Sequence, residues 1–263
     1  MPAPYPDQQR KARGEIDALF SNTASVRVIH YSCESFDDRA DGKSPRITSI
    51  AIRRLDSGQT QSFSIHAIAE RRHVDLADIE AHYDALEKIM LDEFFEHVRS
   101  SGEVEYLHWN MRDSNYGFAA IEHRYKVLGG SPEHILEYRR HDLSIILQDI
   151  YGSEYIPHRR LENLTKENGI TMLRFLSGAT EADKFLQKDY VALHQSTLRK
   201  VDVLSVIVER AYRRTLKTRA SWWVQNGGTV RAFWFWIVAN QSLLFLIAAL
   251  GLIVTIVQII LHR

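Results

Sequence analysis

The feature that most restricts how this chain can fold is a long apolar run near its C-terminus. From residue 232 to residue 261 the sequence "AFWFWIVANQSLLFLIAALGLIVTIVQIIL" contains no formally charged side chain. A helix needs about 20 mostly apolar residues to cross a bilayer, and this run is longer. A buried helix of a globular protein is usually shorter and keeps a polar face. The run therefore predicts one transmembrane helix over residues 232–261.

The flanks of this run predict how it lies in the membrane. Indole rings, which favour the lipid headgroup level, occur at Trp222, Trp223, Trp234 and Trp236. Cationic side chains precede them at Arg210, Arg213, Arg214, Lys217 and Arg219. Because cytoplasmic flanks carry such an excess of Lys and Arg, we expect a single-pass tail anchor with the N-terminal domain in the cytoplasm. Residues 213–231 would form a basic juxtamembrane linker, and the transmembrane helix could associate with further copies as a homo-oligomer.

Composition places the rest of the chain in an ordinary globular class. The 263 residues are 45% hydrophobic and 25% charged, and 33 Lys and Arg balance 33 Asp and Glu. This balance excludes the overall basic excess that is typical of many nucleic-acid-binding proteins, so any basic surface must be local. The sole cysteine, Cys33, cannot form an internal disulfide and is expected to be a buried apolar residue. Residues 1–24 contain no apolar signal-peptide segment and are expected to form a Pro-rich lead-in.

Apolar periodicity predicts an α/β domain over residues 25–212. Strands are expected at "SVRVIHYSC", "ITSIAIRRL", "QSFSIHAI" and "VEYLHW", with a hairpin turn at Ser57 and Gly58 between the second and the third. A long amphipathic helix is expected over residues 74–102, because its apolar residues recur at steps of three and four. Further helices are expected over residues 114–130, 141–152, 159–169 and 181–188, and from residue 189 onward.

Three of these elements carry an acidic residue at or near their ends or on their surface. The order of the elements and of these acids resembles that of the DnaQ-like (DEDD) 3′–5′ exonucleases of the ribonuclease H-like fold. The first strand of that family ends in Asp-x-Glu, and here "HYSCES" places Ser32 and Glu34 at those positions. The second motif of the family, His-Asn-x-x-Phe-Asp, corresponds to "HWNMRD", which keeps His108 and Asp113 at the right separation but has Trp109 in place of the asparagine. The last acid of the family lies on a late helix, which points to Asp202. The resemblance implies a ribonuclease H-like mixed sheet flanked by helices.

The resemblance also implies a metal-dependent active site. In that family carboxylates hold two divalent ions, Mg²⁺ or Mn²⁺, about 4 Å apart, and the ions clamp the attacking and leaving oxygens of a phosphodiester. Here Glu34, Asp113 and Asp202 would be the metal ligands and catalytic acids. His194 would be the general base, although it lies eight residues before Asp202 instead of five. Ser32 replaces the acid that touches both ions, so nuclease activity is expected to be weak or lost.

Each of these residues also has a plain structural interpretation. Glu34 is then a polar strand end, Asp113 caps the helix that follows it, and Asp202 faces solvent on a helix. His108 and Trp109 are then core residues whose polar atoms are satisfied. The sequence leaves both interpretations open.

Two functional classes follow from these observations. The first is a membrane-anchored, exonuclease-like protein that binds single-stranded nucleic acid or a nucleotide between Glu34, Asp113 and Asp202, with weak or lost nuclease activity. The second is a non-catalytic, membrane-anchored effector or sensor that acts through oligomerisation of its transmembrane helix. Ser32 and the displaced His194 favour the second class, whereas the three retained acids favour the first.

Overall fold

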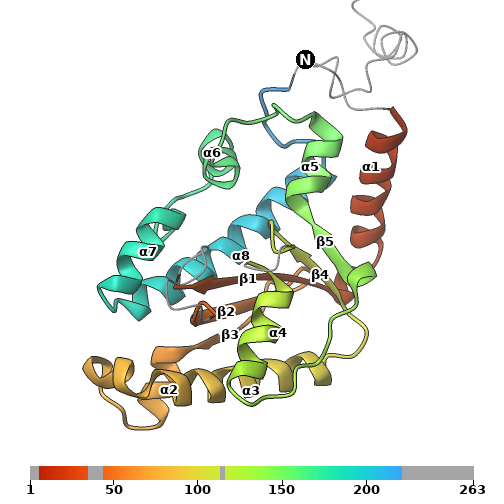
Figure 1. Ribbon diagram of the computed structural model, residues 1–263. Coiled ribbons are helices and arrows are strands. Elements are labelled where there is room, and N and C mark those ends of the chain that lie inside the picture. Colours follow the sequence, from red (N-terminus) through yellow and green to blue (C-terminus); the bar gives the residue numbers. More distant parts are fainter. Residues whose placement is uncertain (1–5, 35–43, 113–115, 221–263) are drawn as a thin grey trace, which may run out of the picture.

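The computed structural model describes residues 6–34, 44–112 and 116–220 of the chain (Figure 1). Within these residues the fold is α/β, with a five-stranded sheet in the order β3-β2-β1-β4-β5. The strands are β1 (Val26–Cys33), β2 (Ile47–Arg54), β3 (Thr60–Ser64), β4 (Glu105–His108) and β5 (Arg140–Asp142). β1 to β3 pair antiparallel, β4 lies parallel to β1, and β5 lies parallel to β4. The expected mixed sheet is confirmed.

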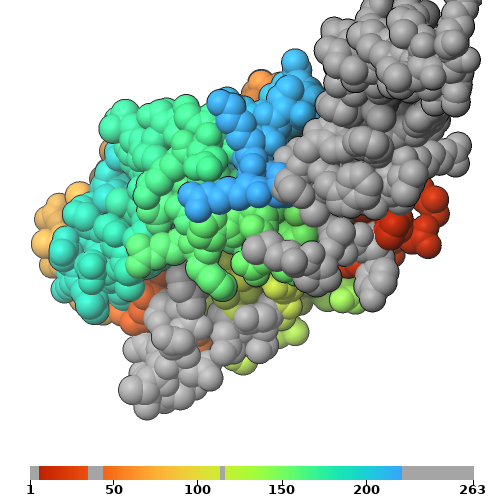
Figure 2. Space-filling view, turned by 90° about the horizontal axis from the view of Figure 1, so that it is seen from above, coloured from red at the N-terminus to blue at the C-terminus, as the bar shows by residue number. Residues whose placement is uncertain are grey.

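Helices flank this sheet on both faces. Three precede β4, namely α1 (Pro6–Ser21), α2 (Ile65–Arg71) and α3 (Tyr83–Ser100). Among the described residues, five follow it, namely α4 (Phe118–Val127), α5 (Leu143–Tyr151), α6 (Arg160–Glu167), α7 (Gly178–Leu186) and α8 (Tyr190–Tyr212). In the view from above, the green and teal surface of α5 to α7 adjoins the blue surface at the end of α8 (Figure 2).

The alternating side chains of β1 divide the core into two layers. Ile29 and Tyr31 are buried in the layer of α2, α3 and α4, whereas Val28 is buried in the layer of α1, α5 and α8. Successive side chains of a strand point to opposite faces, so a strand covered on both faces is usually apolar throughout. His30 and Ser32 share the face of Val28, and both are buried. These two polar positions interrupt the otherwise apolar, fully buried part of the strand, residues 28–33.

The N-terminal segment contains a helix where the sequence suggested an irregular lead-in. In α1, Ala12, Ile16 and Leu19 are buried against α5 and α8, at steps of three and four that suit one helix face. Pro6 stands at the first helical position, where the missing N–H is not needed for the helix. The proline that suggested a lead-in therefore marks the start of a packed helix.

Three other elements differ from the expected ones. β3 ends at Ser64 and α2 begins at Ile65, so the predicted strand "QSFSIHAI" is partly helical. Over so few residues, Ile65 and Ile68 fit a helix face as well as a strand. The long helix expected from residue 74 begins with a 3-10 turn and becomes α-helical at Tyr83. β5 has no counterpart in the sequence prediction, because its three residues, Arg140–Asp142, are all polar and half-buried.

Within the parts of the chain that the structure describes, no helix is both long and apolar enough to cross a membrane. The predicted transmembrane helix, residues 232–261, lies outside the described residues, as does the linker from residue 221 onward. Membrane attachment therefore stays a prediction from the sequence.

Candidate functional site

Glu34 follows β1 and belongs to a network of ion pairs at that end of the sheet. Its two carboxylate oxygens accept hydrogen bonds from Nε and Nη2 of Arg46, each at 3.1 Å. The same guanidinium donates to Glu80 at 2.7 Å and lies over the rings of Tyr83 and Phe185. We call Glu34, Arg46 and Glu80 the acid–arginine cluster. Both oxygens of Glu34 are thus already bound by a two-pronged contact with a cation.

Asp202 lies on α8, near the opposite end of β2. Its carboxylate pairs with Arg199 on the same helix and with Arg53 at 3.5 Å. Arg46 and Arg53 are seven positions apart on one extended segment, which separates their Cα atoms by about 23 Å at about 3.3 Å per residue. The structure therefore does not bring Glu34 and Asp202 together.

The predicted general base, His194, lies against β3 and α2. Its Nε2 is 2.9 Å from the Oγ of Ser62, and its ring centroid is 5.0 Å from that of His66. Burial, with the neighbouring His66 adding to the effect, lowers the pKa of His194 to about 4. Ser32 is buried, and its hydroxyl has no hydrogen-bond partner among the described residues. Asp113 lies outside the described residues.

Of the residues that the resemblance implies for a two-metal centre, the described ones, Glu34, Asp202 and His194, do not converge on one place. Two divalent ions about 4 Å apart need oxygen ligands that converge from separate elements. Glu34 and Asp202 are instead paired with arginines at different ends of β2. Across residues 6–34, 44–112 and 116–220, no group of three or more His, Cys, Asp or Glu side chains is placed to hold a metal ion. The Mg²⁺ or Mn²⁺ role of Glu34, Asp113 and Asp202 stays a prediction that the described geometry does not support.

His108 is a core residue, as the plain interpretation expects. It is buried, and its Nδ1 accepts the backbone N–H of Met111 at 3.2 Å. Burial, together with cationic neighbours of which His141 is the strongest, lowers the pKa of His108 to about 3. The ring is therefore neutral and holds the loop after β4 in place. Cys33 is likewise buried, as expected.

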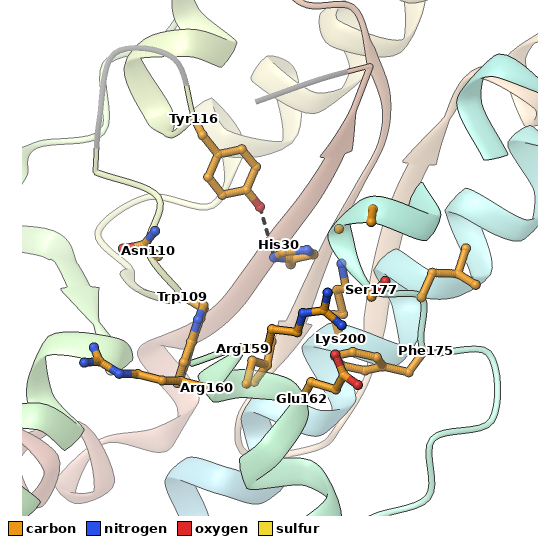
Figure 3. A pocket seen from close by; sticks show the side chains of 14 residues that line it. His30, Trp109, Asn110, Tyr116, Arg159, Arg160, Glu162, Phe175, Ser177 and Lys200 are labelled. Carbon is orange, nitrogen blue, oxygen red and sulfur yellow. Dashed lines mark hydrogen bonds between the residues drawn. The ribbon is translucent and has the colours of Figure 1, made fainter. Parts of the chain in front are cut away.

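A cavity of about 470 Å³ lies between β1, α8 and the starts of α6 and α7 (Figure 3). Its lining side chains come from separate parts of the chain and include His30, Trp109, Tyr116, Arg159, Phe175 and Lys200. We call it the His30 cavity. Pockets of roughly 300–1,000 Å³ are the usual size for small-molecule sites. The cavity is therefore large enough to hold a ligand of that class.

The starts of two helices line the His30 cavity. α6 begins directly after Arg159, and α7 begins after Ser177, whose Oγ accepts the N–H of Thr180 at 3.3 Å. The backbone of Arg159 is left-handed, with φ 60° and ψ 49°, which turns the chain sharply into α6. The first N–H groups of a helix lack partners within the helix and carry partial positive charge. Both helix starts therefore favour an anion in the cavity.

The described side chains that line the cavity carry more positive than negative charge, with Arg159, Arg160 and Lys200 against Glu162. Arg160 is held by an amide and a carbonyl at the end of α5, and Glu162 is paired with Lys166 at 2.6 Å. Among the described residues, no side chain or carbonyl pairs with the guanidinium of Arg159. This guanidinium extends toward His30 and Lys200 (Figure 3). Arg159 is thus a cation available to a ligand.

A further cation of the cavity wall, Lys200, lies on α8. Its Nζ is 2.7 Å from Glu181, which also accepts a hydrogen bond from Ser196 at 2.8 Å. The ring of Phe175 lies 5.6 Å from the same Nζ. An ammonium group has three N–H donors, and Glu181 takes one of them. Lys200 is therefore fixed in position and keeps donors for a further partner.

His30 completes the wall of the cavity although only 5% of its surface is exposed. Its Nδ1 is 3.4 Å from the hydroxyl of Tyr116, and that hydroxyl is 3.2 Å from the carbonyl oxygen of Tyr31. Its Nε2 has no hydrogen-bond partner among the described residues. Burial, with the charge of Lys200 adding to the effect, lowers the pKa of His30 well below its ordinary value. The ring is therefore neutral.

Sequence patterns alone do not reveal the His30 cavity. A signal existed for His30, because it is a polar residue inside an apolar strand, two positions before Ser32 on the same face. No comparable signal existed for Lys200, which looks like a solvated position of an amphipathic helix. Arg159 belongs to a loop whose path follows no periodicity. Only the tertiary structure brings these residues together.

Comparisons with known proteins give limited similarity. No protein-family model matches the sequence, and no curated protein matches it significantly. The family B DNA polymerase from the hyperthermophilic archaeon Pyrobaculum calidifontis is a similar solved structure, with 15% identity and a TM-score of 0.48 over 71% of this chain and 24% of the polymerase. The chain thus spans about a quarter of the polymerase. The catalytic domain of Mos1 mariner transposase is 11% identical, with a TM-score of 0.26 over 80% of this chain and 95% of that one.

Proposed function

We propose that this domain binds a nucleotide, free or at the end of single-stranded nucleic acid, with its 5′-phosphate in the His30 cavity. The observation that carries the proposal is that Arg159, Lys200 and the starts of α6 and α7 line one cavity. Guanidinium groups, ammonium groups and helix N-termini each favour bound phosphate. Their combination suits a phosphate better than any uncharged ligand.

The same cavity suits a nucleobase. Trp109 and Phe175 contribute aromatic rings to its lining. Every base can stack on an aromatic face, so this contact supports binding without strict base preference. A volume of about 470 Å³ fits a ligand the size of one nucleotide and is too small for a duplex. We therefore expect recognition of a single nucleotide unit.

We infer that binding occurs with weak or no phosphodiester cleavage. Phosphodiester hydrolysis by the two-metal mechanism needs both ions held in line with the scissile bond. Glu34 and Asp202 are far apart and each is paired with arginine, so they do not supply such a site. This geometry supports the binding part of the exonuclease-like interpretation and not its catalytic part.

We propose further that residues 232–261 hold the binding domain at the cytoplasmic side of a membrane. The support is their uncharged, apolar composition and the cationic side chains that precede them. The full chain should then stay in the membrane pellet after extraction with alkaline carbonate. Release of the full chain into the supernatant would contradict this part of the proposal.

Calorimetric titration of the full chain with adenosine 5′-monophosphate tests the binding site. Arg159→Asn should weaken binding about tenfold, because it removes an unpaired cation while asparagine tolerates the left-handed backbone. Arg214→Asn is the matched control, since Arg214 is an exposed arginine with a left-handed backbone, φ 57°, and does not line the cavity. Equal affinity in the wild type and Arg159→Asn would overturn the assignment of the cavity.

A short single-stranded oligonucleotide with a 5′-phosphate distinguishes the two sources of the ligand. If the physiological ligand is a strand end, the oligonucleotide should bind more tightly than the mononucleotide, because further phosphates meet local basic groups. If it is a free nucleotide, the longer chain should bind more weakly. Absence of binding by both ligands would overturn the proposed function.

A further inference from the structure

His30 presents a buried hydrogen-bond acceptor that no described residue satisfies. Its Nε2 has no hydrogen-bond partner among the described residues, and His30 is 95% buried while forming part of the cavity wall. Buried polar atoms in native proteins nearly always have a partner. The ring lies between Tyr116 and Lys200 in the cavity (Figure 3). A missing partner at this place therefore points to a ligand.

The hydrogen bonds around Tyr116 decide which nitrogen of His30 carries the proton. A carbonyl oxygen only accepts, so the 3.2 Å contact between Tyr116 and the Tyr31 carbonyl requires the tyrosine hydrogen. The 3.4 Å contact between the same hydroxyl and Nδ1 of His30 is then a hydrogen bond only if Nδ1 donates. A neutral ring with its proton on Nδ1 has a lone pair on Nε2. His30 thus needs a donor.

A phosphate cannot supply that donor. Phosphate oxygens in their ionised form only accept, and they suit the N–H groups of Arg159 and Lys200. The acceptor on His30 needs a second ligand group with a hydrogen to give. In a nucleotide the sugar lies next to the phosphate, and the ribose hydroxyls are both donors and acceptors. The base lies farther from the phosphate and stacks through its face.

We propose that His30 accepts a hydrogen bond from a ribose hydroxyl, so the cavity selects ribonucleotides over their deoxy counterparts. This proposal rests on the proposed function, because it places the phosphate beside Arg159 and Lys200. His30 is then a specificity-determining residue for the sugar. The chemical class of the ligand becomes a ribonucleoside 5′-phosphate, either free or at the end of an RNA strand.

The test compares adenosine 5′-monophosphate with its 2′-deoxy and 3′-deoxy analogues in calorimetric titrations of the full chain. At least one deoxy analogue should bind about tenfold more weakly than the parent, because its binding leaves the acceptor of His30 buried and unpaired. If both analogues bind as tightly as the parent, the sugar proposal is wrong while the phosphate site stands. If none of the three binds, both the sugar proposal and the proposed function fail.

Two substitutions at the same position connect the preference to His30. His30→Phe keeps the ring shape and removes the acceptor, so parent and analogues should bind equally. His30→Gln can place its amide oxygen near the position of Nε2 and should restore part of the preference. Circular dichroism shows whether each variant is folded. An undiminished preference in folded His30→Phe would overturn the proposal.

Discussion

The acid–arginine cluster and the His30 cavity lie on one sheet, but their polar groups are arranged in opposite ways. In the cluster, Arg46 satisfies Glu34 and Glu80 at the same time. In the cavity, Arg159 has no described counterion and Nε2 of His30 has no described donor. Removal of one member of a paired group leaves a buried charge without a partner, whereas unpaired groups of the second kind are open to a ligand. Glu34 and Asp202, two of the acids that resemble a catalytic set, are thus each paired with arginine, whereas unsatisfied groups mark the proposed ligand site.

The largest effect on this comparison is expected from Arg46→Met. The substitution leaves Glu34 and Glu80 without their shared cation and removes the contact with two aromatic rings. The free energy of unfolding should fall by about 3 kcal/mol, since a partly buried charge is left unpaired. Urea denaturation measures this change.

Arg71→Met is the control for that experiment. The ion pair between Arg71 and Glu93 is exposed, with 58% and 38% of the two side chains accessible. Exposed pairs contribute about 0–1 kcal/mol, so this variant should unfold almost as the wild type does. Equal losses in the two variants would remove the distinction between the cluster and an ordinary surface pair. Nucleotide binding by Arg46→Met, measured where it is folded, should remain unchanged.

Trp109→Ala tests the His30 cavity as a ligand site. Trp109 lines the cavity and packs partly against the core, so its removal takes away a stacking surface for the base. Affinity for adenosine 5′-monophosphate should fall by about 1–3 kcal/mol, the range for one base on one aromatic ring. Trp109→Phe keeps a ring and should retain most of the affinity. Calorimetric titration of both variants separates stacking from a general loss of packing, which would affect Trp109→Phe as well.

His141 is a second example of a cationic side chain whose polar atoms are paired, and its charge depends on pH. Its Nδ1 is 2.7 Å from Glu15 of α1, and its Nε2 is 3.0 Å from Glu105 of β4. Burial opposes the charged ring, but hydrogen bonds to the two carboxylates outweigh it and raise the pKa of His141 above 6.5. The stability from this raised pKa is complete below the unfolded-state pKa and disappears as the pH rises through the folded-state value.

His141→Gln tests this pH dependence. Between about pH 5.5 and about pH 8.5, the wild type should lose on the order of 1 kcal/mol of stability relative to the variant. Urea denaturation at several pH values measures the difference, and high salt should reduce it. Parallel stability curves for the two proteins would show that His141 is not charged between its two carboxylates.

The smallest expected effect is that of manganese on the wild type. A metal that binds only the native state raises the melting temperature, and a paired cluster offers it no free carboxylate. Differential scanning calorimetry with and without MnCl₂ should therefore show a change in melting temperature below about 2 °C. A stabilisation of about 1 kcal/mol would shift the melting temperature of a domain of this size by more than that. A clear rise that disappears in Asp113→Ala would break the comparison and restore the metal site that the sequence predicts.

Local patterns predicted most of the fold because strands and helices carry their own periodicity. The buried strand at Val26–Cys33 followed from its apolar run, and the hairpin between β2 and β3 followed from its turn. Gly58 has φ 70° in that turn, which most other residues adopt with difficulty. β5 was not predicted, because its three polar residues show no alternation of apolar and polar side chains. Its position depends on pairing with β4.

The candidate site was not predicted, because its residues meet only through the tertiary fold. Glu34 and Asp202 have the residue type and the order that a nuclease needs, but sequence does not show that each faces an arginine. Whether a carboxylate is free or paired depends on which side chains cross from neighbouring elements. Lys200 and Arg159 are 41 positions apart and have no shared motif. Unsatisfied hydrogen bonds, which reveal the site, can be counted only in three dimensions.

The packing of α1 has a consequence for how the protein is made. α1 is buried against α5 and α8, and Phe20 stacks on Tyr212 with ring centroids 4.1 Å apart. Because α1 is near the N-terminus and α8 is near the end of the described chain, the ribosome releases α1 long before it has synthesised α8. A helix of 16 residues is barely stable alone in water, so its apolar face has no partner during most of synthesis. The layer that contains Lys200 closes only when nearly the whole described chain has left the ribosome.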